Sequence, residues 1–122
     1  MAEVKEYISY PEEKGTINIS EDVVAKIAVA AALETDGVAE MATSIGNEIA
    51  GMFSKKAPNK GVRLMKGEEG VVVEVFILVR SGYSLQEIGD NVQKNVSAAI
   101  EAGTGQMPDK VNVNICGITF EK

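Results

Sequence analysis

Few residues in this sequence belong to the types that usually carry out chemistry. The chain has a single cysteine, Cys116, and it has no histidine and no tryptophan. Without histidine it lacks the usual general base near neutral pH and the commonest nitrogen ligand for zinc. Cys116 lies in a strand-like pattern and has no second cysteine as a disulfide or redox partner. We therefore expect Cys116 to be a small buried hydrophobic residue, and we expect a protein that is not an enzyme and binds no cofactor.

Two other patterns could suggest ligand binding. The glycine-containing segment 103–105 follows a predicted helix, whereas a phosphate loop precedes its helix and ends in Gly-Lys-Ser/Thr. Four carboxylates near the N-terminus lack the spacing of a calcium-binding loop and fit an acidic arm and a helix start. These carboxylates are Glu12, Glu13, Glu21 and Asp22. The sequence therefore predicts neither a phosphate site nor a metal site.

The charge distribution is more informative. The net charge is −6, which argues against nucleic acid as a general partner, yet five of the twelve basic residues lie in one acid-free stretch. One interpretation is a solvated linker and edge strand, since lysines commonly protect sheet edges. The other joins this stretch to the preceding apolar pattern as an interaction face. The candidate residues of that face are Met41, Ile45, Ile49, Phe53, Lys55, Lys56, Lys60, Arg63 and Lys66.

Such a face could meet the acidic arm or helix of another copy, or a surface close to the membrane. Glu40 and Glu48 argue against direct lipid binding, because helices that bind headgroups usually carry a basic polar face. We therefore favour self-association or a protein partner, without direct membrane insertion.

Length and composition indicate one globular domain. A chain of 122 residues with 45% hydrophobic residues can bury one core, and its longest wholly apolar run, Ile27 to Leu33, is too short to cross a bilayer. The first six residues lack the basic start and apolar block of a signal peptide, so we expect a cytoplasmic protein. We expect residues 1–14 to form a flexible arm and residues 15–122 to form a single domain.

The first half of the chain predicts a strand, a helix and a second amphipathic segment. Residues 15–20 alternate as a strand, and Ser20 has the position of an N-cap for a helix that Gly37 should end. Apolar residues three and four apart then continue from Val38 to Phe53, which predicts a second amphipathic helical segment. A basic linker follows, and the next strand should start at about Val62.

The second half has the clearest pattern. Residues 71–80 are apolar on both faces, which suits a central strand. Ser84 and Glu87 have the spacing of a capping box for a helix that Gly103 should end. The last strand, 111–120, changes phase near Cys116 and Gly117, which predicts a bulge. The order β-α-β-β-α-β predicts an α+β two-layer sandwich, ferredoxin-like, with helices on one face of a mainly antiparallel sheet.

Several segments, taken in order, carry a family resemblance. They are Gly15–Ile19, Val23–Ala28, Asp36–Val38, Val92–Val96 and Val111–Ile118. Together they resemble the alkaline shock protein family of Gram-positive bacteria, also called the envelope stress response family, and the resemblance extends from Gly15 to Phe120.

The resemblance implies a cytoplasmic, non-enzymatic protein that forms homo-oligomers and acts in cell-envelope homeostasis. It also implies a small membrane-anchored partner that holds the protein near the membrane. The matching positions imply structural roles for Gly37 and Gly117 in backbone geometry and for Val92 and Val96 in packing, with Gln93 as a polar contact. A module that binds a small or lipid-related ligand is the alternative function.

Overall fold

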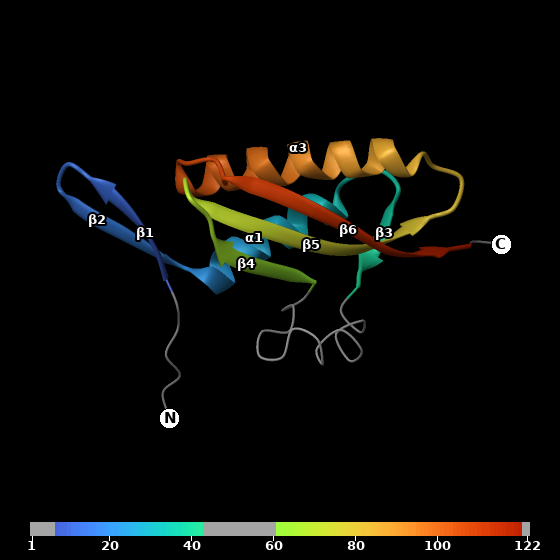
Figure 1. Ribbon diagram of the computed structural model, residues 1–122, viewed down its shortest axis with the longest axis horizontal. Helices are drawn as coiled ribbons and strands as arrows, with labels where there is room; N and C mark the ends of the chain where they lie inside the picture. Colours follow the sequence, from blue (N-terminus) through green and yellow to red (C-terminus); the bar gives the residue numbers. More distant parts are fainter. Residues whose placement is uncertain (1–6, 43–60, 121–122) are drawn as a thin grey trace, which may run out of the picture.

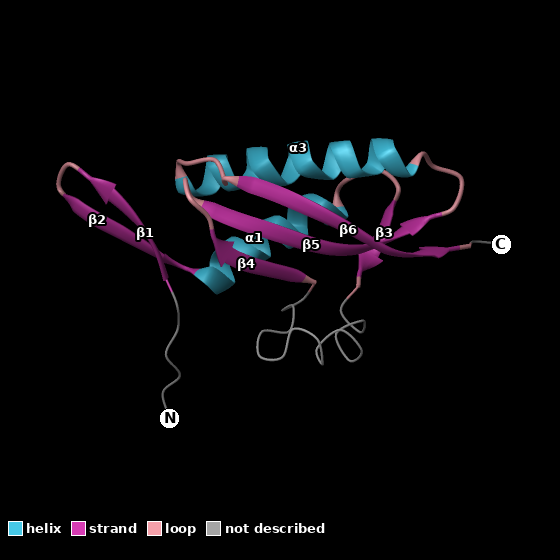
Figure 2. Ribbon diagram, viewed as in Figure 1, coloured by secondary structure: helices cyan, strands magenta, loops and turns pink. Residues whose placement is uncertain are grey.

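The computed structural model describes residues 7–42 and 61–120 (Figure 1). Two helices lie on one side of a sheet, and a separate hairpin projects from one end (Figure 2). The elements are β1 (Tyr7–Glu12), β2 (Gly15–Ser20), α1 (Glu21–Leu33), β3 (Val38–Met41), β4 (Val62–Lys66), β5 (Val71–Arg80), α3 (Leu85–Thr104) and β6 (Lys110–Thr119).

Strand β5 is the centre of the main sheet. Strand β6 runs parallel to it along one edge, while β3 and β4 run antiparallel to it along the other edge. β4 covers the first half of β5 and β3 covers the second half. The apolar residues expected on both faces of residues 71–80 therefore belong to a central strand, as the sequence predicts.

The core lies between this sheet and the two helices. Val73, Val75, Ile77 and Val79 alternate along β5 and are fully buried. They meet apolar stripes from the helices, and burying each large aliphatic side chain contributes about 1.5–3 kcal/mol. The stripes consist of Val24, Ala28, Ala31 and Ala32 in α1 and Ile88, Val92, Val96 and Ile100 in α3. The predicted ferredoxin-like α+β sandwich, with both helices on one face, is confirmed.

Both predicted N-caps are confirmed. The Ser20 hydroxyl accepts a hydrogen bond from the Val23 amide at 3.2 Å, and the Ser84 hydroxyl accepts one from the Glu87 amide at 3.3 Å. Each bond satisfies one amide that the first helical turn leaves without a partner inside the helix. The helix starts therefore follow from local sequence.

The predicted helix ends are wrong by a few residues. α3 continues past Gly103 to a left-handed cap at Gly105, where φ is +88°. Gly103 instead lies against α1, because a Cβ there would come within 2.9 Å of Ile27 Cδ1. α1 ends at Leu33 with Glu34 as its C-cap, and Gly37 occupies the following loop with a φ of +93°. Gly103 is therefore needed for close packing and Gly37 for its loop conformation, and neither residue ends a helix.

The N-terminal hairpin also differs from expectation. β2, predicted as a strand of the main sheet, pairs with β1 in a separate two-stranded sheet. β1 falls within the predicted arm, where no strand was expected. Its residues alternate, so that Ile8 and Tyr10 are more buried than Tyr7 and Ser9, and Ile8 packs against the core. This short alternation is the sequence pattern from which β1 could have been predicted.

The segment from Val38 to Met41 is a strand, so the helix predicted there is wrong. A register shift between Val38 and Glu40 leaves Ala39 as an extra residue in the pairing with β5. Val38 and Met41 are consequently both buried, although they are three residues apart. A β-bulge thus produces the spacing of a helix. The remainder of the predicted amphipathic segment, through Phe53, lies outside the described residues.

β3 and β4 form the two halves of one interrupted edge strand. The Ala42 amide donates to the Phe76 carbonyl at 2.9 Å, and the Phe76 amide donates to the Gly61 carbonyl at 2.8 Å. In an unbroken antiparallel pair, one residue would make both bonds. Ala42 and Gly61 therefore lie at the same point of the sheet edge, opposite Phe76.

Candidate interaction surface

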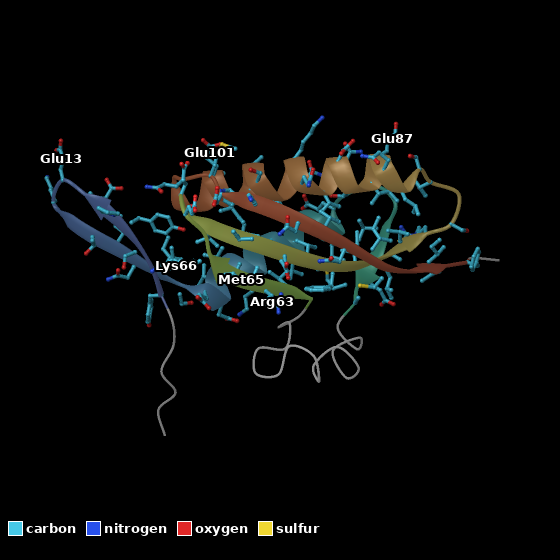
Figure 3. The ribbon with its side chains drawn as sticks, in the orientation of Figure 1. Glu13, Arg63, Met65, Lys66, Glu87 and Glu101 are labelled. Atoms are coloured by element: carbon cyan, nitrogen blue, oxygen red, sulfur yellow. The ribbon has the colours of Figure 1, made fainter. Side chains whose placement is uncertain are left out.

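The structure describes three residues of the predicted interaction face. Met41 belongs to the core, with only 9% of its surface exposed, so it cannot contact a partner directly. Arg63 and Lys66 lie on β4 with Met65 between them (Figure 3). The other predicted residues, Ile45, Ile49, Phe53, Lys55, Lys56 and Lys60, lie outside the described residues.

Arg63 is already engaged within the sheet. Its Nη2 atom lies 2.6 Å from Oε1 of Glu74, and the two residues face each other across the β4–β5 pair. Both side chains are less than one-fifth exposed, so solvent screens the pair less than a surface ion pair. Glu74 alternates with the core residues of β5, which places this ion pair on the sheet face away from the helices. Arg63 thus helps to hold β4 in place.

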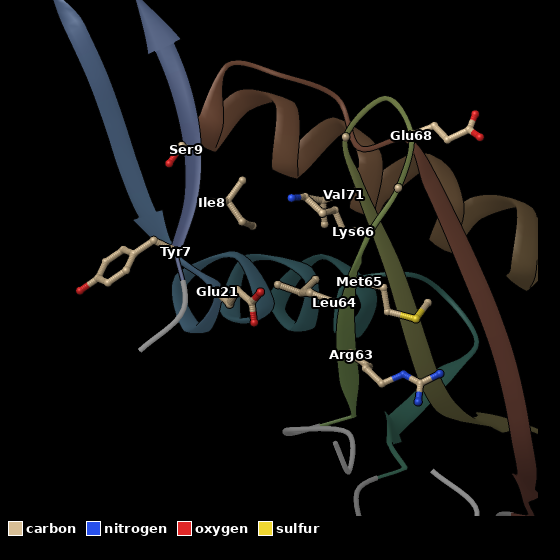
Figure 4. Close-up of a pocket in the computed structure, with 12 residues that line it drawn as sticks. Tyr7, Ile8, Ser9, Glu21, Arg63, Leu64, Met65, Lys66, Glu68 and Val71 are labelled. Carbon is tan, nitrogen blue, oxygen red and sulfur yellow. The ribbon is translucent and has the colours of Figure 1, made fainter. Parts of the chain in front are cut away.

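A cleft of about 880 Å³ separates the hairpin from the main sheet (Figure 4). Ile8 from β1 and Leu64 from β4 supply apolar walls, while Glu21 and Lys66 supply opposite charges. Concave, partly apolar surfaces with a few polar groups are typical of ligand-binding sites. The cleft was missed by sequence analysis because β1 was not recognised as a strand.

Cys116 lies at a predicted bulge that the structure confirms. The pairing of β5 with β6 shifts between Ile77 and Leu78, which leaves Cys116 as the extra residue. Its Sγ atom lies 3.7 Å from the Asn114 carbonyl, and burial raises the pKa of the thiol. A thiol with a raised pKa is a poor nucleophile at neutral pH. Across residues 7–42 and 61–120, no three carboxylates or thiols are grouped to hold a metal ion.

Gln93 makes the polar contact that was expected of it. Its Nε2 atom donates to the Val111 carbonyl at 3.0 Å, which joins α3 to the start of β6. On the other side of α3, Glu87 and Glu101 project away from the sheet, far from Arg63 and Lys66 on β4 (Figure 3). The molecule therefore carries acidic side chains on its helical side and basic side chains along β4.

A family model for alkaline shock protein 23, described as having a cell envelope-related function, matches residues 9–120. The chain belongs to the alkaline shock protein 23 family. The match covers most of the hairpin, both described helices and the whole main sheet. It confirms the resemblance that the sequence segments carry, and with it a cell envelope-related function at the level of the family.

Relatives of this family member occur in Bacillus subtilis strain 168. The uncharacterized protein YqhY is 31% identical over 107 residues, which cover 88% of this chain and 79% of YqhY. The uncharacterized protein YloU is 28% identical over 106 residues, which cover 85% of this chain and 88% of YloU. Among solved structures, a MamM CTD chain matches with a TM-score of 0.47 and 13% identity, covering 83% of this chain and 95% of that one.

Neither described helix of this family member could span a membrane. None is long and apolar enough within the part of the chain that the structure describes.

Proposed function

We propose that this member of the alkaline shock protein 23 family is a non-enzymatic scaffolding protein of the cell-envelope stress response. It is cytoplasmic, associates with itself, and is held close to the membrane by a small membrane-anchored protein. It neither inserts into the membrane nor binds nucleic acid. The family match over residues 9–120 supports the envelope-related part of this proposal.

The interrupted edge strand is the observation that supports an interaction face in this proposal. Residues 43–60 contain most of the predicted contact residues, and the residues that flank this segment, Ala42 and Gly61, both bond to Phe76. Lys66 lies further along the same edge. This position of Ala42 and Gly61, beside the basic residues of β4, supports the proposal that the intervening residues form a contact face at this edge. A partner that binds there need not disturb the core, because the core lies on the helical side.

Charge complementarity favours a second copy or another acidic protein as the partner. Glu87 and Glu101 project from α3, and Glu13 lies at the tip of the hairpin, whereas the basic residues follow β4 (Figure 3). Opposite charges on different sides of one molecule attract neighbouring copies and orient them.

The test replaces Lys55, Lys56 and Lys60 with glutamate. We expect weaker self-association by light scattering and weaker recovery of the protein with native membranes, while the melting temperature stays nearly unchanged. The matched control replaces Lys14, Lys26 and Lys94 with glutamate, because it changes the net charge equally at other positions. A large fall in melting temperature would refute the interaction-face interpretation. A monomer at high concentration with no membrane partner would refute the scaffolding function.

The cleft between β1 and β4 supports a second candidate, a module that binds a small or lipid-related ligand. Its apolar walls and its volume of about 880 Å³ could hold such a molecule. Native mass spectrometry of the purified protein is the direct test. This function requires a bound molecule that survives purification, and bare protein alone would count against it.

A further inference from the structure

Strand β6 leaves one long edge of the main sheet open. Of the described strands only β5 pairs with it, so the backbone groups along its other edge have no strand partner. The opposite edge of the sheet carries Glu40, Arg63 and Lys66, charges of the kind that prevent edge pairing. In β6, no charged residue and no proline occurs between Val111 and Thr119. This edge therefore lacks the usual protection against pairing with another strand.

Hydrogen bonds identify which residues present their backbone to that open edge. Phe76 uses its amide and its carbonyl toward Gly61 and Ala42, so the odd-numbered residues of β5 face β6. In a parallel pair, only one of two opposing residues faces its partner strand. Since Val111, Val113 and Ile115 oppose odd-numbered β5 residues, their backbone groups point outward. The Gln93 amide reaches the outward carbonyl of Val111, in agreement with this assignment.

Beyond the bulge, the outward residues change from odd to even. The Thr119 carbonyl accepts a hydrogen bond from the Ser81 amide at 3.0 Å, so Thr119 faces β5 and Ile118 faces the open edge. Ile118 opposes the core residue Val79, so its side chain lies on the helical side of the sheet. Ile118 is 44% exposed and the following Phe120 is 77% exposed. The second half of the edge thus presents uncovered apolar surface.

We propose that β6 is a second contact for self-association, through which two copies of this chain pair edge to edge and antiparallel. The proposal rests on the self-association in the proposed function and adds to it a surface on the opposite edge of the sheet from β4. Val113 of one copy would pair with Ile118 of the second copy, and Val111 with Phe120 of the second copy. Both pairings join outward backbone to outward backbone, and they place apolar side chains together on the helical side.

The bulge at Cys116 makes this pairing self-complementary. Opposing residues in an antiparallel pair point to the same face of the sheet. In an unbroken strand Val113 and Ile118, five residues apart, would point to opposite faces, whereas the extra residue brings them to the same face. The two-fold axis then passes beside the bulge. The first half of β6 in one copy pairs with the second half of β6 in the other copy, as a two-fold symmetric contact requires.

The principal experiment is sedimentation velocity on the full chain carrying Ile118→Lys. A charged, hydrated side chain at an outward edge position should weaken association at least tenfold. The matched control is Ile17→Lys, because Ile17 is 53% exposed but lies in the separate hairpin. We expect the control to associate like the natural chain. Circular dichroism should show that both variants remain folded, since each position is about half exposed.

If the natural chain associates and Ile118→Lys associates equally well, the β6 contact is overturned while the scaffolding function stands. If the natural chain is monomeric at high concentration, self-association itself fails and the β6 contact fails with it.

Discussion

At the scale of single residues, Gly37 illustrates how a backbone position and a packing position coincide. Its φ is +93°, and a Cβ there would lie 2.7 Å from Cδ1 of the buried Ile88. Gly82 has nearly the same φ, +94°, but a Cβ there would meet no atom within 4 Å. The two positions thus separate the conformational cost of a side chain from its steric cost.

We expect Gly82→Ala to reduce the free energy of unfolding by about 1–2 kcal/mol, the cost of a left-handed conformation. Gly37→Ala should lose about 1–3 kcal/mol more, because the added Cβ would press against the buried side chain of Ile88. Urea denaturation of both variants measures the difference. Equal losses would mean that the loop before β3 adjusts and that the close approach to Ile88 is not a constraint.

The thiol of Cys116 provides a prediction about pH. Burial raises its pKa in the folded protein, and a hydrogen bond with the Ile77 backbone only partly opposes this effect. The folded state therefore keeps its proton at a pH where the unfolded chain begins to lose it. The resulting contribution to stability is complete below the thiol pKa of the unfolded chain and is lost as pH rises through the pKa of the folded state.

We expect the free energy of unfolding to fall with pH above about 8.5, the ordinary thiol pKa, and part of this slope should disappear in Cys116→Ala. Iodoacetamide should also modify the native protein more slowly than the protein unfolded in urea at pH 9, because only the thiolate reacts. Equal modification rates in the two states would contradict a raised pKa.

At the scale of elements, one buried hydroxyl joins α3 to the loop that follows α1. Thr35 is the buried polar residue among those described, and its Oγ1 atom donates to the Ala31 carbonyl at 3.0 Å. The same atom accepts a hydrogen bond from Asn95 Nδ2 at 2.8 Å. These bonds fix the end of α1 against the middle of α3.

Asn95→Ala should therefore cost about 1 kcal/mol, the net value of one such hydrogen bond. Asn91→Ala is the control, because Asn91 is an exposed asparagine on the same helix. Combining Asn95→Ala with Thr35→Val should cost less than the sum of the two single changes, since both remove the same bond. Additive losses in chemical denaturation would show that the two side chains act independently.

The interrupted edge strand predicts that the segment between β3 and β4 is dispensable for folding. Ala42 and Gly61 both bond to Phe76, so Gly-Asn-Gly in place of residues 43–60 should close the gap. Shortening a loop to this extent should raise stability by up to about 1.5 kcal/mol through a smaller closure entropy. Thermal denaturation measures this change, and membrane recovery should be lost in the same variant. Failure to fold would show that the segment supports the sheet.

At the scale of the whole molecule, a feature could be predicted from the sequence when the residues that determine it lie close together in the chain. Caps at Ser20 and Ser84 and the bulge at Cys116 were predictable, because a few neighbouring residues specify each. Strand β3 was not predictable, because the bulge at Ala39 gives Val38 and Met41 the spacing of a helix.

The candidate surface was harder to predict. Met41 illustrates the reason. The sequence pattern places it on the apolar stripe of a helix, whereas in the structure it lies buried in a bulged strand. The open edge of β6 could not be inferred from sequence either, because it depends on which strand is its neighbour. Pairing between distant strands is a property of the whole chain.

The central place of β5 has a consequence for how the molecule opens in solution. Every other strand of the main sheet pairs with β5, while the hairpin of β1 and β2 pairs only within itself. An isolated two-stranded hairpin is only marginally stable in water. Amide hydrogens of β5 should thus exchange with deuterium only when the whole domain unfolds, and those of β1 through local opening. Mass spectrometry of exchanged peptides would measure this gradient, and equal protection would mean that the hairpin and the sheet open as one unit.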